Sequence, residues 1–192
     1  MPIGILGQKK YMTQLFMESG EAVPVTVVSC PQNIVGQIKT MEADGYSAVR
    51  LNAFPKKRPT KTKTHYVKKE IRIEGGDLKK GDTISLENFK DVKDVKVVGV
   101  SKGKGFAGVI KRHHFSGGPG AHGSKFHRQP GSMGTRKPEH TVKGKKLPGR
   151  MGGGRITLLS VPVIKVDVKN GLIALKGSIP GARNSYITII AN

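Results

Sequence analysis

The chain has 192 residues, of which 34 are lysine or arginine and 13 are aspartate or glutamate, so its formal charge at pH 7 is +21. Its single cysteine, Cys30, excludes a disulfide framework and a cysteine-based zinc site, and no run of about 18 apolar residues would span a membrane. A chain this basic needs a polyanionic partner when it is compact, and nucleic acid is the first candidate. An anionic membrane surface would instead require a basic amphipathic helix, and no segment has that pattern.

Short β-strands are predicted on both sides of a central basic segment. Their residues are rich in valine, isoleucine and threonine, and they partly alternate between apolar and polar. Turn residues at 18–21 and at Asp44-Gly45 predict hairpin connections. Many short strands at close spacing predict a mainly β fold, and a barrel is favoured over a sandwich because it leaves no open edge. The strands are expected at residues 22–29, 33–39, 46–52, 83–86 and 92–100, and again at 155–161, 163–168, 172–176 and 186–190.

Residues 101–155 form a different kind of sequence. These 55 residues contain 13 lysines or arginines, one acid (Glu139), five of the six histidines and 14 of the 26 glycines, so they carry +12 while the other 137 residues carry +9. Their apolar residues are too few to form a core. The composition predicts an extension that becomes ordered on a partner, inserted into a globular domain of residues 1–100 and 156–192.

The segment SKGKGFAG, residues 101–108, contains the pattern G-x-G-x-x-G of nucleotide-binding loops. A dinucleotide site also needs a helix that starts at the loop and an acid about 20 residues later. We expect neither, because glycines and a proline at 116–120 interrupt any helix, and Glu139 is the only acid between the loop and Arg155. The motifs that accompany a kinase glycine loop are also missing. The interleaved Lys102 and Lys104 suit an extended phosphate backbone better than one cofactor.

The histidines of this segment do not predict a metal site, because no carboxylates or thiols complete a ligand set. Stacking on bases or hydrogen bonding to ribose is the favoured role, with three phenylalanines adding flat apolar surface. No arrangement of residues predicts a hydrolytic or redox enzyme. The aromatic and imidazole side chains concerned are His113, His114, His122, His127, His140, Phe106, Phe115 and Phe126.

Two shorter features have plainer interpretations. Cys30 lies in an apolar stretch and is predicted to fill the core rather than to act as a nucleophile. The basic run at residues 56–63 has no acid nearby, and it is either a solvated loop or a phosphate contact.

Several motifs follow one another in a fixed order: GVSKGKGFAG at 99–108 with Lys111-Arg112, PGSMG at 130–134, KGKK at 143–146 and GRMG at 149–152. Further matches are KGSIPG at 176–181 and, near the N-terminus, Gly4, Gly7, Lys9, Met12-Thr13 and Phe16. Together they closely resemble the bacterial form of the third universal protein family of the large ribosomal subunit, over nearly the whole chain.

The resemblance implies a β-barrel of the kind shared with translation factors, on the outside of the large subunit, with a long extension threaded inward. It implies a non-catalytic structural constituent that binds 23S rRNA near its 3′ end, joins early in assembly and sends the extension toward the peptidyl transferase centre. The implied partners are 23S rRNA and neighbouring large-subunit proteins in the cytoplasmic ribosome, with no cofactor, metal, membrane or small-molecule substrate. The alternative is a general nucleic-acid chaperone or compacting protein.

The resemblance also assigns rRNA contacts to the extension, with residues 130–137 at its inner tip. Cationic side chains would neutralise phosphates along two legs, and glycines would allow close packing on RNA. The residues assigned in this way are Lys102, Gly103, Lys104, Gly105, Gly108, Lys111, Arg112, His113, His114, Lys125, His127, Arg128, Gly131, Ser132, Met133, Gly134, Arg136, Lys137, Lys143, Lys145, Lys146, Arg150 and Arg155.

The chain departs from this family at three places. Residues 135–139 read TRKPE where some relatives carry a glutamine that is methylated, so methylation is not expected and two positive charges are added at the tip. Lys96 stands where the family usually has Asp or Asn, which predicts a rearranged turn or pairing there. The chain is also somewhat short for the family, and we place the shortening at residues 61–77. No transit peptide is evident, which favours a free-living bacterium over an organelle.

Overall fold

The fold was analysed in a computed structural model that describes residues 4–61, 63–72, 78–135, 137 and 139–191. The chain divides into two compact units, Met1–Ser101 with Arg155–Asn192, and Lys102–Gly154. We call the first the β unit and the second the extension. The prediction of a mainly β fold is confirmed, since the described helices are single turns of four or five residues.

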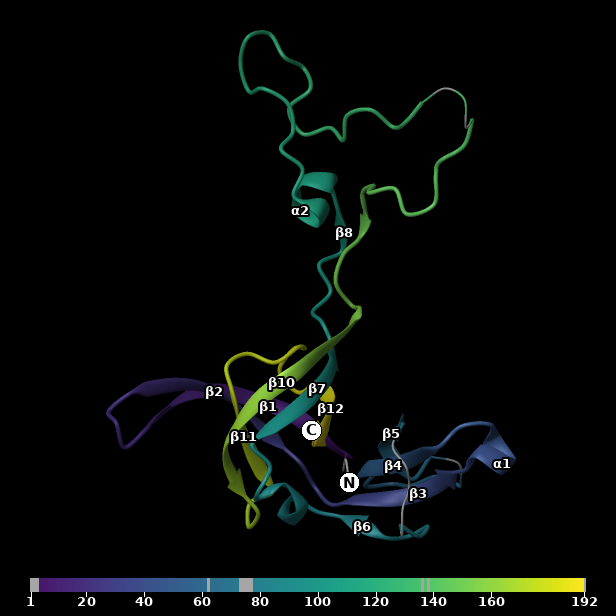
Figure 1. Ribbon diagram of the computed structural model, residues 1–192, viewed down its shortest axis with the longest axis vertical. Coiled ribbons are helices and arrows are strands. Elements are labelled where there is room, and N and C mark those ends of the chain that lie inside the picture. Colours follow the sequence, from purple (N-terminus) through teal and green to yellow (C-terminus); the bar gives the residue numbers. More distant parts are fainter. Residues whose placement is uncertain (1–3, 62, 73–77, 136, 138, 192) are drawn as a thin grey trace. The chain divides into compact units, whose positions relative to one another are not determined.

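Six strands of the β unit pair in a closed ring (Figure 1). Each strand is antiparallel to both of its neighbours. Every strand of the ring therefore has a partner on each side over at least part of its length. In order around this barrel the strands are β1 (Gly4–Phe16), β12 (Tyr186–Ala191), β7 (Asp94–Val100), β10 (Arg155–Asp167), β11 (Leu172–Lys176) and β2 (Ala22–Ser29).

Alternate residues of these strands point inward and form the barrel core. Ile5, Val97, Ile173 and Ile189 are completely buried there, and Cys30 joins them at 3% exposure. Burial raises the pKa of the Cys30 thiol, which keeps it protonated and unreactive. The prediction that Cys30 fills the core is confirmed.

A second antiparallel sheet belongs to the same unit and has its own apolar core. Leu6 of β1 packs into that core, and the Asn33 side chain accepts a hydrogen bond from the Leu6 amide at 3.0 Å and donates one to its carbonyl at 3.2 Å. In order across the sheet, the strands are β5 (His65–Ile71), β4 (Ala48–Pro55), β3 (Asn33–Lys39) and β6 (Thr83–Ile84). Two turns complete the unit, α1 (Met41–Asp44) between β3 and β4, and the 3-10 helix η1 (Leu86–Phe89) after β6.

The strands expected at residues 22–29, 33–39 and 172–176 are confirmed with the same bounds. The strands expected at 155–161 and 163–168 are one strand, β10, which carries a bulge between Leu158 and Val161. Leu86 lies in η1 rather than in a strand. β5 was not predicted, because its lysines and glutamate mask the alternation. Residue 62 and residues 73–77, where we placed part of the shortening, lie outside the described residues.

Lys9 is a buried cation that links the two ends of the chain. Its side chain is 9% exposed, and the Nζ atom donates hydrogen bonds to the carbonyls of Ile179 at 2.9 Å and Gly181 at 3.3 Å. The backbone amide of Lys9 also donates to the Ser185 carbonyl at 3.0 Å. Lys9 therefore fastens β1 to the segment that precedes β12.

Replacing Lys9 with Met should lower the free energy of unfolding by about 2 kcal/mol, because two carbonyl oxygens lose their donor inside the protein. Urea denaturation of the full chain measures this change. The neighbouring Lys10→Met variant is the matched control and should change stability by less than about 0.5 kcal/mol. Equal losses in both variants would contradict the structural role of Lys9.

Candidate nucleic-acid interface

The two legs of the extension are held together at its root by a short antiparallel pair, β8 (Phe106–Ala107) and β9 (Gly149–Arg150). Two further backbone hydrogen bonds continue the pairing, from the Lys104 amide to the Met151 carbonyl and from the Met151 amide to the Gly105 carbonyl, both at 2.9 Å. We expected residues 101–155 to become ordered only on a partner. The root of the extension instead has regular structure in the chain by itself.

A helix does start at the glycine loop, so our expectation that none would form is wrong. α2 (Val109–His113) follows Gly108 and ends where His114 takes a left-handed conformation with φ 59°. One turn is completed before the glycine and proline run at 116–120 begins, which is why those residues do not prevent it. A nucleotide site still lacks its acidic partner, because Glu139 is the only acid in the segment.

α2 is fastened to the opposite leg through the carbonyl of Leu147. Arg112 Nη1 donates to it at 2.7 Å, and His113 Nε2 lies 3.1 Å from it, so the ring nitrogen acts as donor there. A Cβ atom on Gly149 would lie 2.7 Å from Arg112 Nη1, so a larger residue there would displace the guanidinium group from its present position. Arg112 and His113, which we assigned to rRNA, thus also hold the extension in shape.

Two sets of glycines in the extension differ in what surrounds them. At Gly117, Gly118 and Gly152, an added Cβ would lie 2.6, 2.2 and 2.1 Å from a carbonyl oxygen of the chain itself, so internal packing requires glycine. At Gly103 and Gly108, a Cβ would meet nothing within 4 Å, and neither residue has a positive φ. The fold of the free protein therefore does not need glycine at the last two positions.

Aromatic surface lies open along the extension. Phe106 is 80% exposed and Phe126 is 41% exposed. Phe115 and Phe126 line a hollow of about 430 Å³ together with His114 and Pro130. Exposed rings of this kind are suited to stacking on bases.

The structure places most of the assigned cations in contact with solvent. Arg112, His113 and Lys145 are half-buried, while Gly131, Ser132, Met133 and Gly134 are exposed. Arg136 lies outside the described residues. His127 Nδ1 lies 2.9 Å from the Pro119 carbonyl and helps to close the loop between them. The exposed cations are Lys102, Lys104, Lys111, Lys125, Arg128, Lys137, Lys143, Lys146, Arg150 and Arg155.

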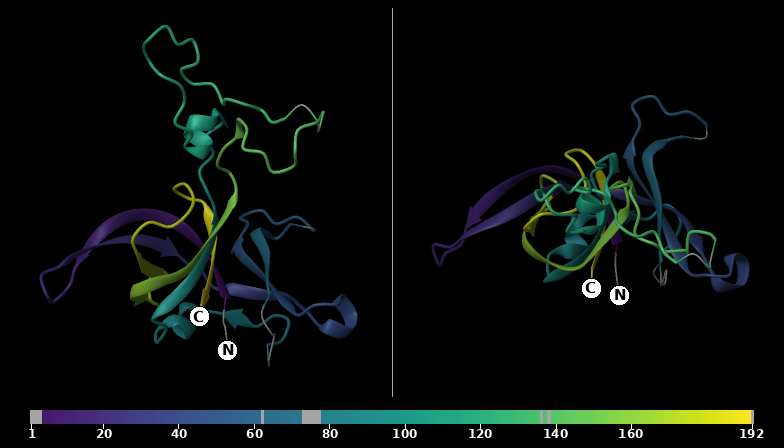
Figure 2. Two further views of the ribbon diagram at one scale, coloured as in Figure 1. Left: turned by 45° about the horizontal axis from the view of Figure 1, so that its top comes forward. Right: turned by 90° about the horizontal axis from the view of Figure 1, so that it is seen from above.

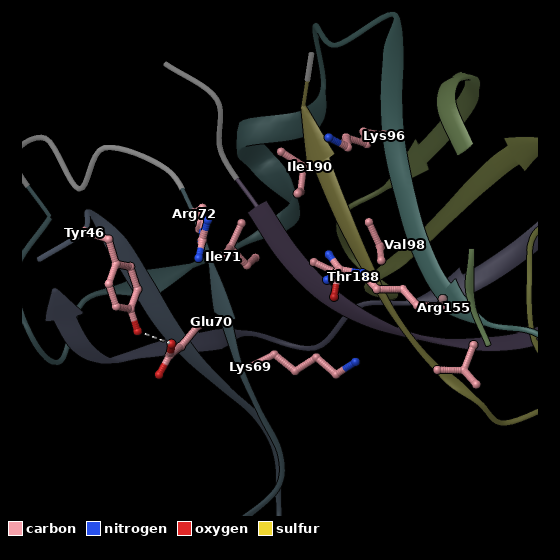
Figure 3. A pocket seen from close by; sticks show the side chains of 12 residues that line it. Tyr46, Lys69, Glu70, Ile71, Arg72, Lys96, Val98, Arg155, Thr188 and Ile190 are labelled. Atoms are coloured by element: carbon pink, nitrogen blue, oxygen red, sulfur yellow. Dashed lines mark hydrogen bonds between the residues drawn. The ribbon is translucent and has the colours of Figure 1, made fainter. Parts of the chain in front are cut away.

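A second cationic surface, not predicted from the sequence, lies within the β unit. Figure 3 shows a hollow of about 510 Å³ between β5 and the strands β7 and β12. Its lining includes Lys69, Arg72, Lys96 and Arg155. Lys96 lies inside β7 opposite Ile190, so no turn is rearranged at this position. Lys69 and Arg72 were missed because β5 itself was not predicted.

The one acid that lines this hollow is already paired. The Tyr46 hydroxyl donates to the Glu70 carboxylate at 3.0 Å, and Lys39 Nζ lies 3.3 Å from it (Figure 3). The Tyr46 hydrogen bond and then Lys39 lower the pKa of Glu70, and the Tyr46 hydrogen bond and then Glu70 raise the pKa of Lys39. The carboxylate therefore does not cancel the positive charge of the hollow.

The remaining features of the described residues add no other kind of site. No three His, Cys, Asp or Glu side chains gather as metal ligands within the part of the chain that the structure describes. None of the described helices is long and apolar enough to cross a membrane. The basic run at 56–63 connects β4 and β5, and its role as a phosphate contact stays a prediction.

A β unit with a cationic hollow and a glycine-rich cationic extension is typical of proteins that bind nucleic acid. Residues 32–169 match the family described as Ribosomal protein L3, and the chain belongs to this family. Proteins of this family are structural components of the ribosome and not enzymes, so the prediction of a non-enzymatic protein is confirmed.

Curated relatives match along nearly the whole chain, and each is named large ribosomal subunit protein uL3. The protein of Exiguobacterium sibiricum is 50% identical over 98% of this chain and 97% of its own length. The proteins of Shouchella clausii and Halalkalibacterium halodurans are 46% and 45% identical over the same shares. The resemblance drawn from the sequence motifs is confirmed.

Removing the Arg112 side chain should loosen the extension, because the Leu147 carbonyl then loses a donor with a full positive charge. We expect the Met151 amide of the Arg112→Ala variant to exchange its hydrogen about tenfold faster than in the unaltered chain. The matched control is Lys111→Ala, which removes an exposed cation from the same helix. Equal exchange in all three proteins would show that Arg112 does not hold the legs together.

Proposed function

We propose that this chain is a structural constituent of the large ribosomal subunit that binds 23S rRNA through its extension and through the cationic hollow of its β unit. The observation that carries the proposal is the segment of residues 101–155, whose two paired legs hold 13 lysines or arginines and a single acid. In the same proposal the chain binds near the 3′ end of 23S rRNA, joins early in assembly, and sends residues 130–137 toward the peptidyl transferase centre. The barrel is of the translation-factor kind, which the closed ring of six strands supports.

Electrostatic attraction supplies most of the binding free energy in this proposal. Each lysine or arginine that neutralises a phosphate releases condensed counterions, so a segment of charge +12 gains affinity from many weak contacts. Ordering of the glycine-rich chain opposes binding by about 1 to 2 kcal/mol per fixed residue. The β8–β9 pair and the contacts of Arg112 reduce this cost, because they order the root before RNA binds.

The open glycines support direct contact with RNA. At Gly103 and Gly108 the chain's own packing leaves room for a side chain, and both positions are exposed in the same short segment as Lys102, Lys104 and the exposed ring of Phe106. A backbone without a side chain lets a phosphate or a sugar approach closely. Glycine at positions 103 and 108 is therefore better explained by contact with RNA than by packing within the protein.

A general nucleic-acid chaperone is the alternative, since it would have the same charge. That function requires neither a fixed extension nor a dedicated hollow, and it predicts equal affinity for DNA and RNA. Membership of a ribosomal protein family favours the structural role.

Sedimentation of a host lysate through a sucrose gradient at high salt separates these two functions. A chain whose extension is enclosed by rRNA should remain with the large subunit, because salt screens surface contacts but does not extract an enclosed segment. We expect co-migration with the large subunit after a wash in about 1 M salt. Release to the top of the gradient would contradict the structural role and favour the chaperone.

Replacement of Gly103 or Gly108 by Ala should weaken binding to 23S rRNA about tenfold, because the new methyl group would collide with RNA and not with the protein. Thermal stability of the free chain should stay the same. The Lys102→Ala variant is the electrostatic control, and it should reduce the slope of log K against log salt by about 0.7. Unchanged affinity in both glycine variants would show that RNA does not approach these positions.

A further inference from the structure

The β1–β2 hairpin continues beyond the rest of the barrel as a two-stranded ribbon (Figure 2). β12 pairs with β1 only as far as Gln8, and β11 pairs with β2 only from Val25 onward. Residues 14–16 therefore pair with residues 22–24, and neither segment pairs with any other described strand. A two-stranded hairpin alone is at best marginally stable in water. An additional surface that covers the ribbon would stabilise it.

Both faces of this ribbon carry mainly apolar side chains, but one face is more exposed to solvent than the other. Directly paired residues share a face, so Leu15 with Val23, and Thr13 with Val25, form one face, and its valines are 7% and 0% exposed. The opposite face is formed by the pairs Met12 with Thr26, Gln14 with Pro24, and Phe16 with Ala22. Thr26 is buried, and the other five side chains are exposed.

We call this opposite face the ribbon face. Strands that turn one face to solvent normally carry polar residues there. On the ribbon face, Phe16 is 71% exposed and Met12 is 50% exposed. Tyr11 and Met17, which precede Met12 and follow Phe16 in the sequence, are 50% and 42% exposed. Clustered aromatic and methionine side chains of this kind mark interaction surfaces.

The charge of this region differs from that of the whole chain. No lysine or arginine occurs between Lys10 and Lys39, although the chain has 34 of them. The acids of the same stretch are Glu18 and Glu21, both exposed at the tip. The Met17 amide donates to the Glu21 carbonyl at 2.9 Å, which closes the turn and keeps both carboxylates at the end of the ribbon.

These charges determine which occupant fits. RNA is disfavoured, because two carboxylates without any cation would repel phosphates. A second copy of this chain is disfavoured, because two molecules of charge +21 repel each other. A basic protein segment is favoured, since its apolar side chains can cover Met12 and Phe16 while its lysines or arginines reach Glu18 and Glu21.

We propose that the ribbon face, together with the acidic tip, docks a basic segment of another protein of the large subunit. This proposal rests on the proposed function and assigns the protein partner to one surface of the chain. In the bound state, Phe16 and Met12 lose their contact with water at the centre of the interface. Glu18 and Glu21 form its rim, where complementary charge orients the partner.

Photo-crosslinking in purified large subunits tests the proposal. A phenylalanine that carries a benzophenone group replaces Phe16 in one strain and Phe106, an exposed ring of the extension, in another. After irradiation, the position 16 probe should yield an adduct with a lysine- and arginine-rich protein segment, identified by mass spectrometry. An adduct with RNA alone, with a second copy of this chain, or with nothing would overturn the proposal.

The position 106 probe serves as the matched control and should yield an adduct with rRNA. If it does not, the proposed role of the extension fails, whatever the probe at position 16 reports. The double variant Glu18→Lys/Glu21→Lys, with the probe kept at position 16, should reduce the yield of the protein adduct about tenfold. An unchanged yield would contradict the role of the acidic tip, because both side chains are exposed and their replacement leaves the fold intact.

Discussion

The pairing of β7 with β10 is the interaction on which the rest of the protein depends. Val100, the last residue of β7, lies opposite Arg155, the first residue of β10, so the ring of strands brings together two residues that are 55 positions apart. Closure of a long loop is unfavourable in entropy, and here burial of the barrel core compensates for it. The extension therefore starts and ends at adjacent points, and its legs need only the short β8–β9 pair and the Leu147 carbonyl to stay together.

The surfaces of this chain differ in the sign of their charge. The extension and the hollow around Lys96 carry exposed cations, and the one acid that lines the hollow, Glu70, is compensated by Lys39. The ribbon has no cation and an acidic tip. A protein of charge +21 that keeps one apolar surface with an acidic tip can attract nucleic acid and still orient a protein neighbour, because the two kinds of contact do not compete for the same residues.

Glycine serves two purposes that composition does not distinguish. Gly117, Gly118 and Gly152 let the chain pass close to its own carbonyls, and any larger residue there would collide with the protein. Gly103 and Gly108 have no such neighbour. We assigned the glycines of SKGKGFAG to close contact with RNA. Gly105 has a φ of 68°, which favours glycine in the free protein, whereas the described fold does not require glycine at Gly103 and Gly108. Arg112 is the opposite case, since we assigned it to phosphate and the structure also gives it an internal partner.

The sequence by itself determined the β content, the positions of several strands, the central cationic segment and the family, because alternation, turn residues and ordered motifs are local signals. It also predicted the burial of Cys30. Only the tertiary structure decided that β10 is continuous, that a helix follows Gly108, and that Lys69, Arg72 and Lys96 line one hollow. Lys69 lies in β5, Arg72 follows that strand directly and Lys96 lies in β7, and no local pattern predicts which strands lie side by side. The apolar ribbon face was likewise hidden, because Met12 and Phe16 resemble core residues until the pairing and exposure show that the described part of the chain leaves both side chains open to solvent.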